Sequence, residues 1–186
     1  MPKITKEPTG APFPTPVVLV TTAAKGRTNI ITLAWAGVVC SSPLMIGLAI
    51  RPSRYSYSLL LDNPELVVNL PRAGQVEAAD VCGTVSGRDT DKFAKTGWTA
   101  VSGEEVTAPL IGECPINLEC RVDKRLSLGT HDLFICQVLR SHVDEEMVDD
   151  AGRVDFGRLE PFVYAGMDYW TLADKIGHYG YSKKQA

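Results

Sequence analysis

Hydrophobic and polar residues alternate over the first eight positions of residues 116–125, where Ile116, Leu118, Cys120 and Val122 are the apolar ones. This period of two predicts a β-strand with one buried face. Residues 131–142 are also largely apolar but alternate less regularly, which predicts a strand buried on both faces. Runs of β-branched and aliphatic residues predict further strands, which cover residues 16–22, 29–39, 44–50, 65–70 and 162–167.

Helical patterns are fewer and shorter. They cover residues 55–61, 75–85 and 89–96. We expect Asp89 to be the N-cap of the third helix and Gly97 to follow its end. Many strands joined by short turns, with only two or three helices, predict a mainly β protein, a closed or partly open β-barrel with helical inserts. We expect one domain over residues 1–186, with the barrel over residues 13–168 and a C-terminal arm over residues 169–186.

Residues 28–50 contain no charged side chain, and this length could span a bilayer. Polar residues and a proline interrupt the stretch, and the Ser-Ser-Pro sequence at residues 41–43 is typical of a turn. We therefore expect two buried strands joined at residues 41–43 and no membrane span.

Composition and charge narrow the class of protein. The 186 residues are 45% hydrophobic and 22% charged, which is ordinary for a globular domain. The net charge of −3 lacks the basic excess of a general nucleic-acid binder. The five cysteines are odd in number and show no C-x-x-C spacing, which argues against a disulfide framework or a zinc site. With no apolar leader visible at the N-terminus, we expect reduced thiols and a cytoplasmic protein.

Several motifs of common enzyme classes do not occur in the sequence. It has no Gly-x-Gly, no Gly-Lys pair and no Gly-x-Ser-x-Gly, and its three histidines lack the spacing of a metal-binding helix. These absences argue against a dinucleotide-fold dehydrogenase, a nucleotide hydrolase, a zinc protease or a serine hydrolase.

A basic, hydroxyl-rich run at residues 51–58 lies between an apolar strand and a predicted helix. A helix N-terminus attracts anions, so Arg51 and Arg54 with the hydroxyls of Ser53 and Ser56 could form a phosphate cradle. Alternatively, Ser53 is an ordinary N-cap and both arginines are solvated.

Two further segments could contact a ligand. Asn29 and Thr32 are polar within an apolar run and could hydrogen-bond the polar edge of a flat ring, or they could be a turn residue and a core threonine bonded to the backbone. Arg88 and Lys92 could bring positive charge to an anion, or they could pair with acidic neighbours on a capped surface helix. His131 follows a turn, where a lone histidine is usually structural.

Taken together and in order, these segments resemble the flavin-reductase-like family of FMN-binding split β-barrels, and within it the flavoredoxin-type branch. The resemblance covers residues 13–180. Its motifs are Val17-Val18-Leu19-Val20-Thr21, Asn29-x-x-Thr32-x-Ala34-Trp35, Ser41-x-Pro43, Arg51-Pro52-Ser53-Arg54-Tyr55-Ser56, Asn69-Leu70-Pro71, Ser86-Gly87-x-x-x-Asp91-Lys92-Phe93, Gly129-x-His131 and Tyr169-Trp170-x-Leu172-x-x-x-Ile176-Gly177.

The resemblance implies a Greek-key split barrel, a homodimer, and FMN bound near the subunit interface. It implies phosphate contacts from Arg51, Ser53, Arg54, Ser56 and Lys92. It implies that the isoalloxazine and ribityl groups are lined by Asn29, Ile30, Ile31, Thr32, Trp35, Val39, Cys40 and Ser41. Ser86 and Arg88 would close the site, from the same or the other subunit.

The expected activity is that of an FMN-dependent oxidoreductase. Bound FMN would take hydride from NADH or NADPH, or electrons from a redox partner protein, and reduce free flavin or another acceptor. Flavin reductases that serve monooxygenases often carry Gly-Asp-His where this chain has Thr130 before His131, which leaves open whether His131 seats a nicotinamide. The alternatives are an electron carrier without turnover of its own and a barrel whose flavin pocket is vestigial.

Overall fold

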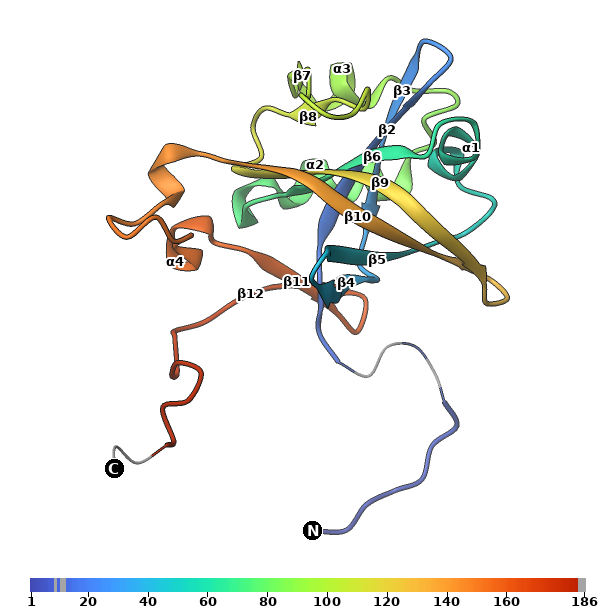
Figure 1. Ribbon diagram of the computed structural model, residues 1–186. Coiled ribbons are helices and arrows are strands. Elements are labelled where there is room, and N and C mark those ends of the chain that lie inside the picture. Colours follow the sequence, from blue (N-terminus) through green and yellow to red (C-terminus); the bar gives the residue numbers. More distant parts are fainter. Residues whose placement is uncertain (9, 11–12, 184–186) are drawn as a thin grey trace.

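The computed structural model describes residues 1–8, 10 and 13–183. Its centre is one antiparallel sheet of seven strands in the order β3-β2-β6-β9-β10-β5-β4 (Figure 1). The strands are β2 (Val18–Ala24), β3 (Arg27–Leu33), β4 (Ala36–Ser41), β5 (Leu44–Ile50), β6 (Glu65–Leu70), β9 (Ile116–Ser127) and β10 (Asp132–Val143).

The sheet curls toward a barrel but stays split between its two edge strands. β3 pairs with β2, whereas β4, which follows it in sequence, pairs with β5. The amide of Ala49 donates to the carbonyl of Trp35 at 3.0 Å, so the connection between β3 and β4 is held to β5. Within the described residues no strand ladder joins the two edges. The chain is therefore a mainly β protein with a partly open barrel.

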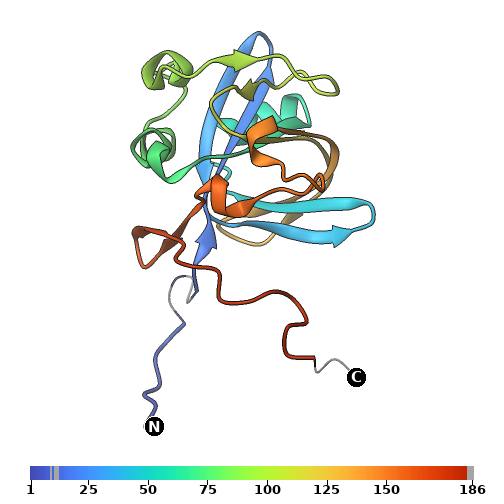
Figure 2. The same ribbon diagram turned by 90° about the vertical axis from the view of Figure 1, so that its left-hand side faces the viewer.

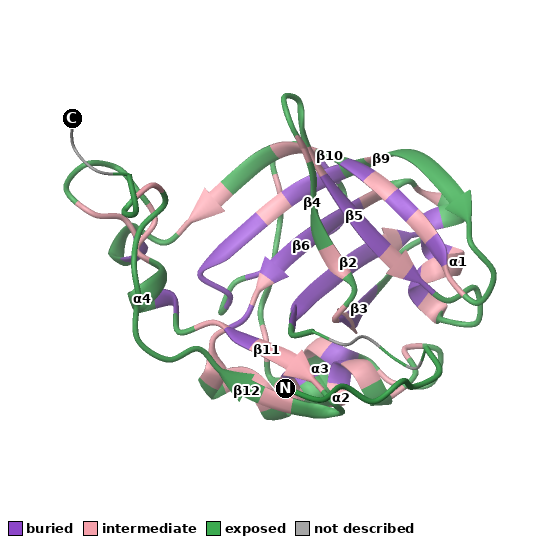
Figure 3. Ribbon diagram, turned by 90° about the horizontal axis from the view of Figure 1, so that it is seen from below, coloured by how far each residue is buried: buried purple, intermediate pink, exposed green. Residues whose placement is uncertain are grey.

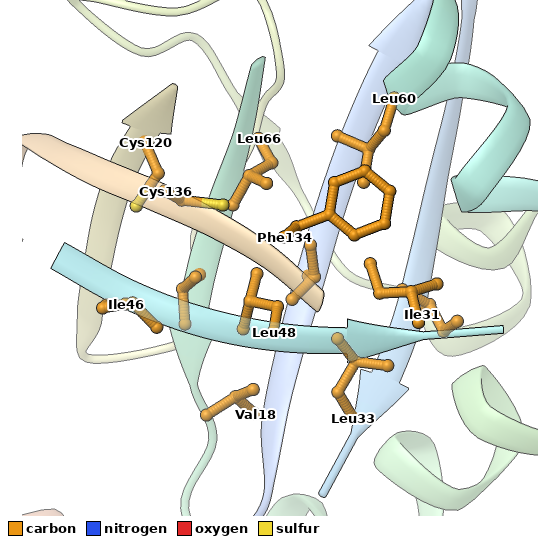
Figure 4. Close-up of a cluster of buried hydrophobic side chains, with 13 residues drawn as sticks. Val18, Ile31, Leu33, Ile46, Leu48, Leu60, Leu66, Cys120, Phe134 and Cys136 are labelled. Atoms are coloured by element: carbon orange, nitrogen blue, oxygen red, sulfur yellow. The ribbon is translucent and has the colours of Figure 1, made fainter. Parts of the chain in front are cut away.

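The hydrophobic core fills the inside of the curled sheet. Phe134, Leu48 and Leu66 are fully buried there, and Figure 4 shows their side chains turned toward one another. Complete burial of one such side chain is worth about 1.5–3 kcal/mol. β2 is buried on both faces, because Val18 and Val20 join this core while Leu19 packs into a second cluster on the other side.

Four helices and two smaller sheets surround the central sheet. Both α2 and α3 pack on β3, outside the sheet (Figure 2). α1 packs on β2, and its Leu60 joins the core inside the curled sheet (Figure 4). The helices are α1 (Tyr55–Asp62), α2 (Val76–Thr84), α3 (Lys92–Thr96) and α4 (Phe156–Leu159), with single 3-10 turns at Ala73–Gln75 and Glu145–Met147. The small sheets contain β1 (Thr15–Pro16), β11 (Phe162–Ala165) and β12 (Asp168–Thr171), and β7 (Ala100–Val101) with β8 (Leu110–Ile111). None of the helices in the described part of the chain is long and apolar enough to cross a membrane.

The sequence prediction was wrong for residues 29–39. They form two strands rather than one, because the chain bends at Ala34 and Trp35 and changes its pairing partner. The second strand, β4, is an edge strand and is largely exposed rather than buried (Figure 3).

Three further predictions need correction. The helix expected at residues 89–96 starts at Lys92, because Asp91 and not Asp89 accepts the capping hydrogen bond, from the amide of Ala94 at 3.2 Å. β10 is not buried on both faces, because buried and half-buried residues alternate in its first half and no residue of its second half is buried. The strand expected at residues 162–167 ends at Ala165, and the region predicted as an arm begins with β12. Gly97 does end α3, with φ of 72°.

Candidate functional site

Two adjoining cavities lie at the end of the sheet near α1 and α2. The first, here the basic cavity, has a volume of about 160 Å³ and is lined by three cationic side chains, those of Arg54, Arg88 and Lys92. The second, here the aromatic cavity, has a volume of about 470 Å³ and is lined by rings that include Trp35 and His131. Ile31, Arg54, Gly83 and Thr84 line both cavities, so the two form one continuous hollow.

A larger hollow of about 1180 Å³ lies between residues 149–161 and 171–177. It shares no lining residue with the other two. None of the site residues expected from the sequence lines it, and its Arg153 is paired with Asp149 at 2.9 Å. We therefore build the candidate site on the basic and aromatic cavities.

The turn before α1 forms one wall of the basic cavity. Arg54 is the N-cap of α1, in extended conformation, and its side chain makes no capping hydrogen bond. The first amides of a helix lack acceptors within the helix and carry partial positive charge. Ser53 is therefore not the N-cap, which removes the structural alternative proposed for it from the sequence.

Unpaired guanidinium groups gather at the hollow. Among the described residues, no carboxylate lies within salt-bridge distance of Arg51, Arg54 or Arg88. Arg88 donates to the carbonyl of Ser53 at 3.3 Å and its guanidinium lies 5.5 Å from the centroid of the Tyr55 ring. Positive charge left without a protein partner in a concave surface attracts anions.

Lys92 is buried and not a surface residue. Its Nζ donates to the carbonyls of Ile30 and Cys82, each at 2.6 Å. Burial, together with the nearby charge of Arg54, lowers the pKa of Lys92 to about 8. The alternative in which Lys92 pairs with acidic neighbours on a surface helix is therefore wrong.

Asn29 contributes a buried polar atom without a partner. Its Nδ2 donates to Oγ of Ser56 at 2.8 Å, whereas among the described residues its buried Oδ1 has no hydrogen-bond partner. Buried acceptors in folded proteins are nearly always satisfied. A Cβ on Gly87 would lie 1.9 Å from this Oδ1, so the loop at residues 85–91 approaches Asn29 only because residue 87 is glycine. The amide oxygen of Asn29 is therefore an unpartnered acceptor beside the basic cavity, under the backbone of Gly87.

His131 in the aromatic cavity is fixed as a neutral imidazole. Its ring lies 4.5 Å from Trp35 between centroids, and Nε of Arg51 lies 3.2 Å from its Nε2. A guanidinium can only donate, so Nε2 accepts, and Nδ1 carries the proton and donates to Oγ1 of Thr130 at 3.0 Å. Burial and the charges of Arg51 and Arg54 lower the pKa of His131.

The hollow brings together most of the residues expected from the sequence. The basic cavity is lined by Asn29, Ile31, Ser53, Arg54, Ser86, Arg88 and Lys92, all within one chain. The aromatic cavity is lined by Ile31, Thr32, Trp35, Arg51, Arg54 and His131. Thr32 lines it even though its hydroxyl donates to the carbonyl of Ala79.

Five expected residues line neither cavity. Ser56 lies behind Asn29 as its buried hydrogen-bond acceptor, and Ile30 is a core residue whose carbonyl binds Lys92. The other three are Val39, Cys40 and Ser41 on the edge strand β4. Arg51 lines the aromatic cavity and not the basic one.

Sequence reasoning missed several lining residues. Tyr164, Met167 and Tyr169 of the β11–β12 hairpin were not among the expected site residues, and no local pattern places them beside Trp35. Gly83 within α2 did carry a signal, because a glycine inside a helix often marks a close approach. A Cβ there would lie 3.3 Å from Cβ of Thr32.

The fold and the hollow define a split-barrel protein with a cationic pocket that opens into a ring-lined one. The family description "Flavin reductase like domain" matches residues 9–173, and the chain belongs to this family.

Among solved structures, the chain is similar to flavoredoxin from Methanosarcina acetivorans, with 31% identity, coverage of 99% of this chain and 98% of that one, and a TM-score of 0.92. It is 37% identical to an uncharacterized protein of Archaeoglobus fulgidus over 61% of this chain and 64% of that protein. It is 28% identical to FMN reductase (NADH) RutF of Pseudomonas syringae pv. syringae over 66% of each chain. The chain thus spans about two thirds of these two curated relatives.

Proposed function

We propose that the protein binds FMN in the two joined cavities and acts as an oxidoreductase of the flavin reductase type. It would move hydride from NADH or NADPH, or electrons from a donor protein, to free flavin or another acceptor. The observation that carries this proposal is the basic cavity, whose unpaired guanidiniums face a hollow continuous with the aromatic cavity. When bound, FMN supplies the hydride- and electron-accepting ring.

The basic cavity suits the phosphate of FMN. Arg54, Arg88 and Lys92 offer charged donors, and the start of α1 adds its backbone amides. The unpartnered Oδ1 of Asn29 suits a hydroxyl of the ribityl chain, which donates a hydrogen bond. Ser53 and Ser86 add hydroxyls at the rim.

The aromatic cavity suits the flavin ring. Ile31 and Trp35 provide apolar surface for a flat ring and exclude water from it. The neutral His131 lies beside Trp35, where we assign it to the side of the electron donor. Because it is held neutral by Arg51, it serves to position a ligand rather than to supply a proton.

An electron carrier without turnover of its own is the second candidate. It is favoured by the likeness to flavoredoxin over nearly the whole chain. It also agrees with a site whose one histidine is already engaged on both ring nitrogens. In this case FMN would bind tightly and would be reduced by a partner protein but not by NADH or NADPH.

We propose a homodimer with β4 at the interface, in a reducing compartment such as the cytoplasm. Val38 and Val39 on this edge strand are 68% and 55% exposed, and Trp35 just before it is 44% exposed. Adjacent exposed apolar side chains on an edge strand indicate an interaction surface. All five cysteines are free. Sedimentation tests this interface. We expect the unaltered protein to sediment as a dimer and Val38→Lys to sediment as a monomer.

Steady-state oxidation of NADH and NADPH with added FMN tests the enzymatic proposal. Turnover that saturates with flavin supports a flavin reductase. Tight FMN binding without oxidation of either nucleotide supports the carrier. A protein that binds no FMN contradicts both and leaves the vestigial pocket.

A further inference from the structure

The β11–β12 hairpin forms a wall of the aromatic cavity that the flavin reductase assignment does not explain. Tyr164, Met167 and Tyr169 line this cavity together with Trp35 and His131. The hairpin belongs to a separate small sheet with β1 and is not part of the barrel. Tyr164 and Tyr169 also pack against the hydrophobic cluster behind β2 and β3, whereas Met167 does not.

The hairpin is firmly held close to its tip. The hydroxyl of Tyr169 donates to Oδ1 of Asp80 on α2 at 2.9 Å, and the rings of Tyr164 and Tyr169 meet edge-on with centroids 5.8 Å apart. Thr15 of β1 pairs with Tyr164. Figure 3 shows β11 and β12 beside α2 at the same end of the molecule. The position of the hairpin tip is thus set by several contacts from two neighbouring elements.

The tip carries a methionine in an unfavourable backbone conformation. Gly166 and Met167 form a two-residue turn between Ala165 and Asp168, with φ of 61° and 78°. Such a turn favours asparagine or glycine at both positions, and a longer side chain there is strained. The side chain of Met167 is 82% exposed, so no core packing offsets this strain. Strain without a packing reason points to a role in ligand contact.

Arg51 gives the same cavity a positive charge separate from the basic cavity. Its Nε donates a hydrogen bond to His131, and among the described residues no carboxylate lies within salt-bridge distance of its guanidinium. It does not line the basic cavity, where we place the FMN phosphate. An anionic group on a second ligand would meet this guanidinium.

We propose that the aromatic cavity takes a flat, anionic second ligand beside the flavin, with its charge met by Arg51 and its width limited by Met167 at the hairpin tip. This inference rests on the proposed function, because the flavin ring forms the remaining wall of the site. Methionine suits such a contact, because its sulfur and flexible chain pack well on rings.

The test uses the FMN-loaded protein and three redox-inert probes of increasing width, benzoate, 2-naphthoate and anthracene-2-carboxylate. Binding is measured by the change in the visible spectrum of the bound flavin. We expect the unaltered protein to bind benzoate best. In Met167→Gly we expect the affinity for the three-ring probe to rise about tenfold and that for benzoate to stay within about a factor of two.

The matched control is Lys25→Gly. Lys25 occupies the same kind of strained turn, between β2 and β3, with φ of 52°, and lines neither the basic nor the aromatic cavity. Lys25→Gly relieves the same kind of backbone strain as Met167→Gly but at a turn away from both cavities. It should therefore leave the order of probe affinities unchanged. If Lys25→Gly changes the probe order as Met167→Gly does, the effect comes from turn stability and the inference fails.

The charge contact is tested with benzoate and neutral benzamide. In Arg51→Gln we expect benzoate affinity to fall about tenfold and benzamide affinity to stay constant. Equal loss for both ligands, or equal affinity for all three carboxylates in the unaltered protein, overturns this inference while FMN binding stands. Failure of the unaltered protein to bind FMN overturns the proposed function and this inference with it.

Discussion

Replacement of Arg54 by methionine tests the placement of the FMN phosphate most sharply. Arg54 lines both cavities, and its guanidinium has no carboxylate partner among the described residues. Although it is the N-cap of α1, its side chain makes no capping hydrogen bond. Methionine keeps an unbranched apolar stem and removes the charged guanidinium, so we expect little change in the stability of α1.

The expected loss follows from one charged contact. A hydrogen bond to a charged group contributes about 1.5–3 kcal/mol. The dissociation constant for FMN should therefore rise roughly 10- to 150-fold. Riboflavin has the same ring and ribityl chain but no phosphate, so its affinity should change by less than about threefold.

Equilibrium dialysis with FMN and with riboflavin measures both constants under the same conditions. Arg27→Met is the matched control, because Arg27 contacts the hydroxyl of Tyr55 at 3.5 Å but lines neither cavity. It should leave both affinities unchanged. If Arg54→Met weakens riboflavin as much as FMN, Arg54 does not bind the phosphate and our reading of the basic cavity is refuted.

Two further predictions concern packing and pH. Gly87→Ala places a Cβ against Oδ1 of Asn29. We therefore expect the free energy of unfolding, measured with urea, to fall by about 1–3 kcal/mol and FMN binding to weaken. If neither quantity changes, the close approach of residue 87 to Asn29 is contradicted. Buried Glu119 accepts hydrogen bonds from the amides of residues 104–106 and from His142, and these outweigh the effect of burial and lower its pKa to about 2. Its stabilisation is therefore complete above its ordinary pKa of 4.5 and is lost as the pH falls toward about 2. As the pH is lowered through this range, the urea midpoint of the unaltered protein should fall, and that of Glu119→Gln should fall less. If the midpoints of both proteins fall in parallel, Glu119 does not stabilise the fold in this way.

A strand could be predicted where apolar and polar side chains alternate along the sequence. Residues 116–125 lie within β9 as predicted, but both faces of the strand are buried at its start, because Asn117 and Glu119 are buried as well as Ile116 and Cys120. Residues 29–39 could not be divided, because the apolar run continues through the bend at Trp35 while the pairing partner changes from β2 to β5. A change of partner is a long-range property, and local periodicity does not record it.

The candidate site, like the strands, could be predicted only in part. The turn around Arg54 was predictable, because its donors are contiguous and precede a helix. The contribution of Met167 was not, because it depends on how a distant hairpin packs beside α2. Lys92 was assigned to the site, but its burial against two backbone carbonyls follows only from the packing of α3 on β3.

The central claim is that the two joined cavities hold FMN, and an absorbance spectrum tests it most directly. The purified protein is mixed with excess FMN, freed of unbound flavin by gel filtration, and scanned before and after anaerobic addition of NADH and then NADPH. We predict the two absorption bands of an oxidised flavin, near about 370 and 450 nm, in the protein fraction. Bleaching by one nucleotide would identify a flavin reductase, whereas a colourless protein fraction would contradict the account.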